Sequence, residues 1–94
     1  MPIPSEWDLS GKTAIITCDE RGWTPVLANA LASVGASVAL AGSSKSDMGE
    51  ASKLVKSTGG NVLVMETDLT NATEVDQMFG LVVKHFGQID ILVN

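Results

Sequence analysis

The chain has 94 residues and a formal charge of −5, with six lysines and arginines against eleven aspartates and glutamates. This length allows at most one domain, residues 1–94, and an apolar content of 45% is typical of a folded α/β chain rather than a disordered one. The few cations are scattered, so we expect no nucleic-acid partner. One cysteine excludes an internal disulfide and a multi-cysteine metal site.

Membrane association is also not expected from the sequence. No apolar run approaches the roughly 20 residues that a membrane-spanning helix needs. The first six residues have neither the basic region nor the apolar region of a signal peptide. We therefore expect a cytoplasmic location and no membrane partner.

Short apolar runs alternate along the chain with longer segments of helical periodicity. Each run is too short for a helix, and near-continuous apolar strands are typical of a parallel sheet that is covered on both faces. The sequence therefore predicts four strands, over residues 13–17, 37–41, 61–65 and 89–93.

The segments between these runs predict three helices, over residues 24–34, 47–57 and 74–86. Thr24 can cap the first helix, and Pro25 suits its first helical position. In each helix the apolar residues follow the helical period, most closely in the third, and a glycine follows at or near each carboxyl end. The first helix is expected to bury Leu27, Ala30, Leu31 and Val34, and capping-box spacing relates Asp47 to Glu50 and Asn71 to Glu74.

The order of these elements, with a helix after each of the first three strands, determines the expected fold. Because crossover connections between parallel strands are right-handed, the sequence predicts a doubly wound parallel α/β sheet with the strand order 3-2-1-4. The chain ends at Asn94, so we interpret the sheet as truncated after its fourth strand. That strand would be an open edge, and we expect the chain to self-associate through it.

Four segments resemble the short-chain dehydrogenase/reductase family, which has a Rossmann-type fold. Residues 8–17 resemble the family's opening strand, and residues 31–42 its first helix and second strand. Residues 68–70 (Asp-Leu-Thr) are similar to its acidic motif after the third strand. Residues 86–94 match the approach to its Asn-Asn-Ala-Gly motif up to the first Asn.

The resemblance implies an oxidoreductase that transfers hydride between a nicotinamide nucleotide and a carbonyl or alcohol. In the family, the catalytic Ser and the Tyr-x-x-x-Lys motif lie well beyond the fourth strand, and this sequence has no tyrosine. We therefore assign no catalytic residue, and we expect the 94-residue chain alone to be inactive as an enzyme.

The family's phosphate-binding turn, Thr-Gly-x-x-x-Gly-x-Gly, corresponds here to residues 17–24. Only the middle glycine, Gly22, matches, since Cys18 and Thr24 replace the other two. The first glycine normally permits a tight turn and the last one close packing of helix and strand. Asp19 and Glu20 stand near the expected pyrophosphate, where carboxylates oppose the binding of an anion unless they point to solvent.

The sequence favours NADP over NAD as the cofactor. By resemblance, a basic residue before the middle glycine accompanies NADP use, and Arg21 holds that position. Alternatively, Arg21 is a solvated turn residue that pairs with Glu20 or Asp19. The end of the second strand offers Gly42 and Ser43 with no acid to hold a ribose 2′-hydroxyl, whereas Ser43 can hydrogen-bond a 2′-phosphate. For the isolated chain, the alternative is that no cofactor binds.

The remaining candidates for cofactor binding each have a structural alternative. By resemblance, Asp68 lies beside the adenine and Leu69 touches its face, but Asp68 can simply end a strand and Leu69 can simply pack. Asn94 approaches the ribose or is a frayed terminus. Trp23 covers the phosphates or packs at the rim of the core, and Thr17 opens the turn. Cys18 is a reactive thiol or a small buried filler.

Two other functions compete with the oxidoreductase. A non-catalytic Rossmann module, with its cofactor site lost, would act in interaction or assembly, and the altered turn favours it. A phospho-acceptor receiver domain would also be doubly wound, with acids after its first and third strands, but it gives no reason for residues 87–94 and lacks the lysine after a fifth strand.

Overall fold

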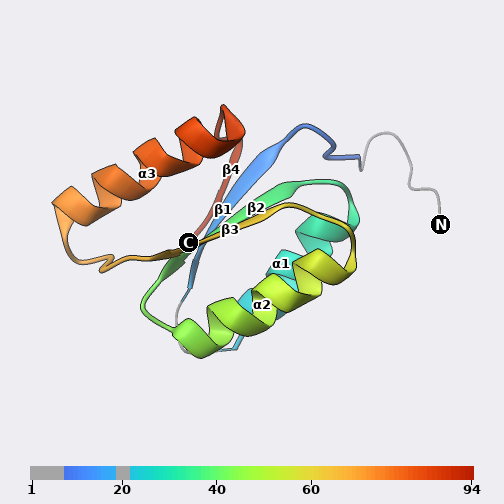
Figure 1. Ribbon diagram of the computed structural model, residues 1–94, viewed down its shortest axis with the longest axis horizontal. Coiled ribbons are helices and arrows are strands. Elements are labelled where there is room, and N and C mark those ends of the chain that lie inside the picture. Colours follow the sequence, from blue (N-terminus) through green and yellow to red (C-terminus); the bar gives the residue numbers. More distant parts are fainter. Residues whose placement is uncertain (1–7, 19–21) are drawn as a thin grey trace.

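The computed structural model describes residues 8–18 and 22–94, which form four strands and three helices (Figure 1). In chain order these are β1 (Thr13–Cys18), α1 (Thr24–Ser33), β2 (Ser37–Gly42), α2 (Lys45–Ser57), β3 (Val62–Glu66), α3 (Ala72–Phe86) and β4 (Ile91–Val93). The number and order of the predicted elements are confirmed. Asp19, Glu20 and Arg21 lie outside the described residues.

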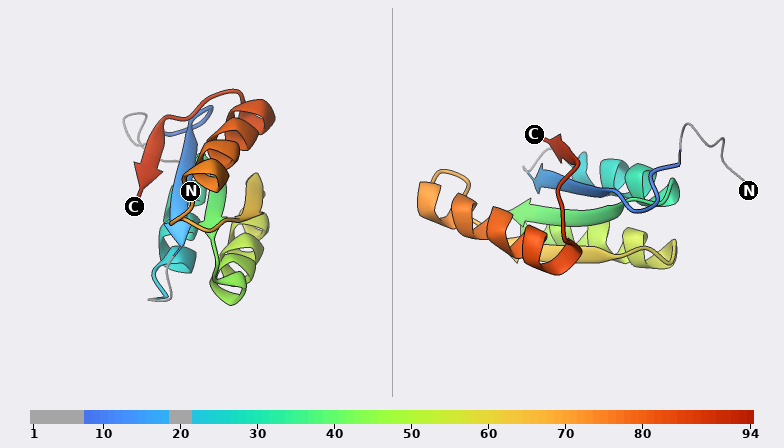
Figure 2. Two further views of the ribbon diagram at one scale, coloured as in Figure 1. Left: turned by 90° about the vertical axis from the view of Figure 1, so that its left-hand side faces the viewer. Right: turned by 90° about the horizontal axis from the view of Figure 1, so that it is seen from above.

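The four strands form one parallel sheet in the order β3-β2-β1-β4, as predicted. Helices α1 and α2 cover one face of this sheet and α3 covers the other, as the edge-on views show (Figure 2). Such a sheet is doubly wound: the chain moves outward from β1 in one direction through α1 and α2, then returns through α3 to the other side of β1.

Alternate residues of the strands contribute to two apolar cores, one on each face. Beneath α1 and α2 lie Ile16, Val38 and Leu40, which pack against Met48 and Val55, among others. On the opposite face, the second core joins one residue of β1, two of β2 and one of β3 to two from α3: Ile15, Ala39, Ala41, Met65, Met78 and Val82. Strands β1 and β2 are thus buried on both faces, which explains their near-continuous apolar sequence.

The ends of α1 and α2 differ from the sequence prediction. Thr24 does not cap α1: Trp23 holds the N-cap position, and Thr24 lies within the helix, where it is buried against the sheet. Helix α2 begins at Lys45, two residues before the predicted start, so Asp47 lies inside its first turn rather than at its cap. Polar residues at a helix start fit several cap positions, so spacing alone did not identify the cap in use.

The buried face of α1 is rotated relative to the predicted stripe. Ala28 and Ala32 are the fully covered apolar positions of this helix after its first turn, whereas Ala30 is exposed. Leu27 and Leu31 are partly buried against the same core. Small residues therefore face the sheet, which lets the helix approach it closely.

Helix α3 begins at Ala72 because Asn71 caps it as predicted. The Glu74 backbone N–H donates to Asn71 Oδ1 at 3.1 Å. The reciprocal half of the predicted capping box is absent, because Glu74 Oε1 accepts from the Asp68 backbone N–H at 3.2 Å instead. The helix ends at Gly87, whose φ of 89° gives the left-handed turn that glycine tolerates best.

Strand β4 is shorter than predicted, because Asp90, at the start of the predicted strand, binds the start of β1 through its side chain. The Thr13 backbone N–H donates to Asp90 Oδ2 at 2.9 Å, and the Asp90 backbone N–H donates to Thr13 O, also at 2.9 Å. Regular pairing therefore begins only at Ile91, opposite Ala14.

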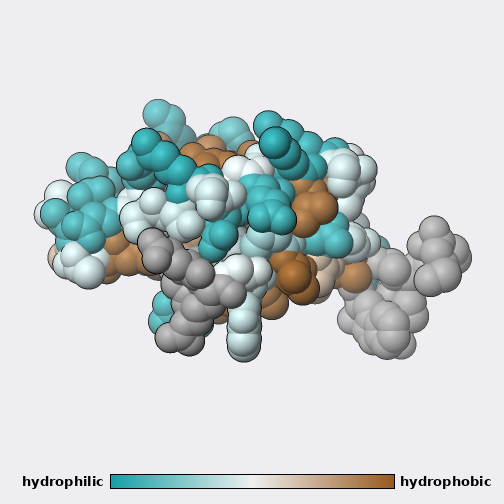
Figure 3. All heavy atoms as spheres, turned by 90° about the horizontal axis from the view of Figure 1, so that it is seen from below, coloured by the Kyte–Doolittle hydropathy of each residue, from teal (hydrophilic) through white to brown (hydrophobic). Residues whose placement is uncertain are grey.

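Strands β3 and β4 form the two edges of the sheet, and each exposes an apolar side chain. Val64 of β3 is 45% exposed and Leu92 of β4 is 54% exposed. Figure 3 shows that on one face of the molecule hydrophobic residues reach the surface as separate patches among hydrophilic ones. None of the helices in the described part of the chain has the length and apolar content needed to cross a membrane.

Candidate functional site

The candidate site lies where the carboxyl ends of β1 and β4 meet the start of α1. Strand β1 is the point at which the strand order reverses, and open α/β sheets bind ligands in the crevice at such a point. A cavity of about 140 Å³ opens here, lined by Ile16, Thr17, Trp23, Thr24, Leu27, Val93 and Asn94. Three residues proposed from the sequence, Thr17, Trp23 and Asn94, are therefore brought together.

Thr17 and Asn94, 77 residues apart in sequence, form a direct contact. Thr17 Oγ1 lies 3.0 Å from Asn94 Oδ1 and 3.3 Å from the backbone oxygen of Val93. A hydroxyl has one hydrogen to donate, so these two acceptors share it. The contact fixes the end of β4 beside the end of β1 and places polar atoms at the mouth of the cavity.

The turn into α1 leaves room beside its one matching glycine. Gly22 has a φ of +78°, and a Cβ added there would meet no atom of the described chain within 4 Å. Trp23 makes no side-chain hydrogen bond to the first turn of α1. The start of a helix carries the positive end of its dipole, which favours the binding of anions there.

Trp23 lies at the start of α1, beside Leu27 at the border of the core. Its side chain is 69% exposed, and it lines a second hollow of about 280 Å³ together with Gly22, Val26 and Leu27. Trp23 also lines the first cavity, so it borders both hollows. Whether it covers phosphates stays a prediction.

Cys18 is the last residue of β1, and it is buried. Its side chain is 5% exposed within the core beneath α1, and its Sγ donates to the backbone oxygen of Ile16 at 3.6 Å. This placement agrees with the interpretation of Cys18 as a small buried filler. It replaces the first glycine of the family turn without leaving the strand.

Gly42 faces Cys18 across β1 and β2 at an unusually close approach. A Cβ added to Gly42 would lie 2.6 Å from the Cys18 backbone oxygen, and the φ of Gly42 is +155°. No side chain fits there unless the backbone moves. The next residue, Ser43, is exposed and free of the strand pairing, at the edge where the candidate site opens.

Asp68 and Leu69 follow β3 at the same edge of the sheet. Asp68 Oδ1 accepts from Thr70 at 3.0 Å (backbone N–H) and 2.6 Å (Oγ1). Leu69 lines a hollow of about 180 Å³ that also includes Thr17, Leu92 and Asn94. Leu69 thus lines the same hollow as Thr17 and Asn94. The Asp68 carboxylate, by contrast, accepts its hydrogen bonds within a local turn.

The two hydrogen bonds from Thr70 lower the pKa of Asp68, first through the hydroxyl and then through the backbone N–H, because they favour the charged carboxylate. We expect Thr70→Val to move the pKa of Asp68 back toward its ordinary value, as measured by carbonyl-detected NMR titration. Since the folded-state pKa is depressed, the turn stabilises the fold above the unfolded pKa of Asp68, and this contribution is lost as pH falls through the folded value.

The matched control for this titration is Asp8, whose pKa is lowered in the same way by Ser10. In the Thr70→Val variant the pKa of Asp8 should stay unchanged. An unchanged pKa for Asp68 would contradict the assignment of its hydrogen bonds.

The structure also adds a cation that the sequence analysis did not assign to this edge. Lys45, the first residue of α2, follows Gly42, Ser43 and Ser44, and its Nζ lies 3.6 Å from Glu66 Oε2 at the end of β3. Both side chains are largely exposed. The sequence signal that could have identified Lys45 is its position shortly after the second strand.

Comparisons with known proteins agree with this geometry. The short chain dehydrogenase family matches residues 12–94. The chain belongs to this family. An uncharacterized oxidoreductase of Staphylococcus haemolyticus is 37% identical over 87 residues, which cover 93% of this chain and 37% of that protein. A hydroxynaphthalene reductase of Aspergillus fumigatus is 36% identical over 87 residues, covering 92% of this chain and 32% of the relative.

A solved structure of a short-chain dehydrogenase/reductase gives the same result for the fold. A doubly substituted variant of the Serratia marcescens enzyme has a TM-score of 0.82 and 36% identity, and the match covers 92% of this chain and 36% of that one. The short chain dehydrogenase family in general uses nicotinamide cofactors, which fits a crevice at the strand-order reversal. This chain spans about a third of the length of the curated relatives that it matches.

Proposed function

We propose that this chain is the nicotinamide-nucleotide-binding part of a short-chain oxidoreductase. The observation that carries the proposal is the contact between Thr17 and Asn94, which joins the ends of β1 and β4 beside the crevice where the strand order reverses. A bound cofactor would there supply hydride transfer between its nicotinamide and a carbonyl or alcohol. Relatives named as oxidoreductases and reductases support this reaction class.

The residues of the site fit such a cofactor. The start of α1 and the open space at Gly22 would hold the pyrophosphate, with Thr17 opening the turn and Trp23 flanking it. Leu69, with Asp68 beside it, would contact the adenine, and Asn94 would approach the ribose. Because the family's catalytic groups correspond to no residue of 1–94, we propose cofactor binding, and no catalytic group, as the role of these residues.

We further propose a preference for NADP over NAD. An acid at the end of the second strand commonly holds the ribose 2′-hydroxyl of NAD. Here β2 ends in Gly42, where a side chain would collide with the Cys18 backbone oxygen, so an acid cannot take that place without a shift of the backbone. Ser43, which follows, would donate to a 2′-phosphate, and Arg21 would add charge.

The alternative function is a non-catalytic module that acts in interaction or assembly. The observation in its favour is that Cys18 and Thr24 stand where the family turn has glycines and both are buried in the core, so neither is free to make way for a pyrophosphate. Asp19 and Glu20 add negative charge to the same turn.

Isothermal titration calorimetry of the chain, with NADPH and separately with NADH, tests the proposal. We expect NADPH to bind more tightly than NADH. Ser43→Ala should weaken NADPH binding about tenfold and leave NADH binding unchanged, since a hydrogen bond to a charged group contributes about 1.5–3 kcal/mol.

Ser57→Ala is the matched control, because Ser57 lies at the far end of α2 and donates to the Leu54 backbone oxygen at 2.6 Å. It should change neither titration. Binding of neither nucleotide by a folded chain would favour the non-catalytic module, and equal binding of both would contradict the preference for NADP.

A further inference from the structure

The outer edge of β3 presents backbone hydrogen-bonding groups in a regular pattern. The Val38 N–H donates to Asn61 O at 3.0 Å, and the Thr67 N–H donates to Gly42 O at 2.9 Å, so the odd-numbered residues of this segment point toward β2. Because peptide groups alternate along a strand, the N–H and C=O of Val62, Val64 and Glu66 point outward. In the described part of the chain, no strand pairs with this edge.

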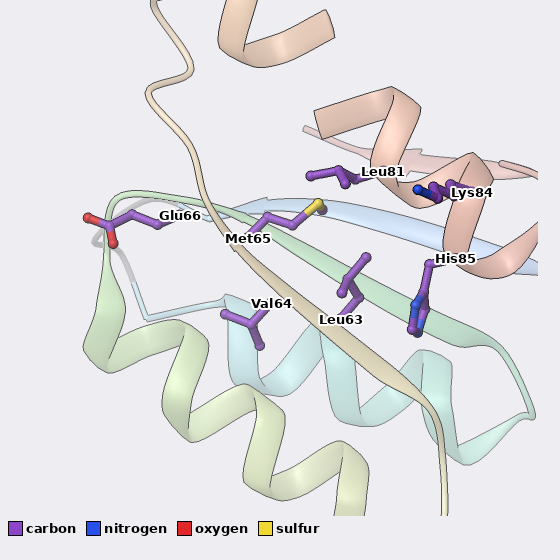
Figure 4. A pocket seen from close by; sticks show the side chains of 7 residues that line it. All are labelled: Leu63, Val64, Met65, Glu66, Leu81, Lys84 and His85. Atoms are coloured by element: carbon purple, nitrogen blue, oxygen red, sulfur yellow. The ribbon is translucent and has the colours of Figure 1, made fainter. Parts of the chain in front are cut away.

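A groove runs along this edge between β3 and α3. It has a volume of about 570 Å³ and is lined by Leu63, Val64, Met65, Glu66, Leu81, Lys84 and His85 (Figure 4). Leu63 and Met65 point toward α3, whereas Val64 points away from it. The strand has no proline, lysine or bulge, which are features that keep an edge from pairing, and its one charged residue is the last, Glu66.

We propose that two copies of the chain associate by antiparallel pairing of their β3 strands, with Val64 facing Val64 of the second copy on a two-fold axis. In this register Val62 of one copy faces Glu66 of the other. All of these are residues with outward-pointing N–H and C=O groups, so each facing pair exchanges two hydrogen bonds, as hydrogen-bonded antiparallel pairs do. The two sheets become one continuous sheet.

Charge complementarity identifies the occupant of this edge as a second copy. Glu66 already lies 3.6 Å from Lys45 at the start of α2. Lys56 follows Lys45 by eleven residues, about three helical turns, so both lysines lie on the same side of α2.

The carboxyl end of α2, with Lys56, lies near the amino end of β3, since the Gly60 N–H donates to Val55 O at 3.2 Å and β3 begins at Val62. Antiparallel pairing brings Glu66 of each copy to that end of the other. Each Glu66 then lies between its own Lys45 and Lys56 of the second copy, on the face of the sheet that α2 covers. A strand from an unrelated protein would match this pattern of charges and groups only by chance.

Sedimentation equilibrium on the 94-residue chain tests the pairing. We expect a monomer–dimer equilibrium whose dissociation constant rises at least about tenfold in Val64→Lys, because like charges would face each other at the axis. Val83→Lys is the matched control: Val83 is 47% exposed, close to the 45% of Val64, and it lies on α3 outside the groove. It should leave the dissociation constant unchanged.

A charge reversal provides a second test that does not depend on a single variant. Glu66→Lys and Lys56→Glu should each weaken the dimer, and the double variant should recover most of the loss. A chain that stays monomeric at several hundred micromolar would overturn the proposal. So would equal effects of Val64→Lys and Val83→Lys, as expected for association through β4 or another surface, or a double variant that recovers nothing.

Discussion

Gly42→Ala should lower the free energy of unfolding by about 3 kcal/mol or more, as measured by urea denaturation followed by circular dichroism. The alanine Cβ would lie 2.6 Å from the Cys18 backbone oxygen and 3.2 Å from the Cys18 Cβ. The φ of +155° adds strain, since residues with a side chain seldom adopt it. The oxygen belongs to the strand pairing of β1 with β2, so relief requires the two strands to move apart at their carboxyl ends.

Gly59→Ala is the matched control for this substitution. Gly59 has a φ of +79°, and a Cβ there would meet no described atom within 4 Å. Gly59→Ala should lower the free energy of unfolding by about 1 kcal/mol, through backbone strain alone. Equal losses for the two variants would show that the close approach of Gly42 to Cys18 has no energetic consequence.

The Gly42 substitution also bears on the cofactor site. Gly42 and Cys18 end two adjacent strands, and the turn into α1 and the exposed Ser43 follow directly from them. A shift of the backbone where Gly42 meets Cys18 would therefore displace both the turn into α1 and Ser43. We therefore expect Gly42→Ala to weaken nucleotide binding in molecules that remain folded, whereas Gly59→Ala should not.

Most of the fold could be predicted from the sequence because apolar periodicity reports burial directly. The two central strands are covered on both faces, so their sequences are almost continuously apolar. The strand order then follows from the right-handedness of crossover connections. The predicted start of a strand was least accurate where a side chain, rather than the backbone of the neighbouring strand, accepts the hydrogen bond. Asp90 takes the Thr13 N–H, so β4 begins later than its apolar run suggests.

The candidate site was predictable in part. The resemblance named Thr17, Asp68 and Asn94 as separate candidates, and the structure joins Thr17 to Asn94 because the carboxyl ends of parallel strands meet at one edge. The contact of Gly42 with Cys18 depends on the register between β1 and β2, which the sequence does not specify. The N-cap of α1 was misplaced because Thr24 is a good cap residue that is used instead to fill the core.

Leu40→Ala should lower the free energy of unfolding by about 2–5 kcal/mol. Leu40 is fully buried in the middle of β2, between Ile16 of β1 and Val64 of β3 in the strand register, and it packs in the core beneath α1 and α2. Its loss leaves a cavity that the closely packed helices cannot fill. Stabilities of about 5–15 kcal/mol are ordinary for domains, so a chain this small would come close to unfolding, which urea denaturation would record.

The same truncation at Leu92 separates burial from residue type. Leu92 lies on edge strand β4, opposite Ile15, and is 54% exposed, so Leu92→Ala should cost no more than about 0.5 kcal/mol. A large loss at Leu92 would mean that its side chain is covered in solution, by a second copy or by another chain, and would place an interface at β4. A small loss there with a large one at Leu40 would show that burial, rather than residue type, sets the cost of each truncation.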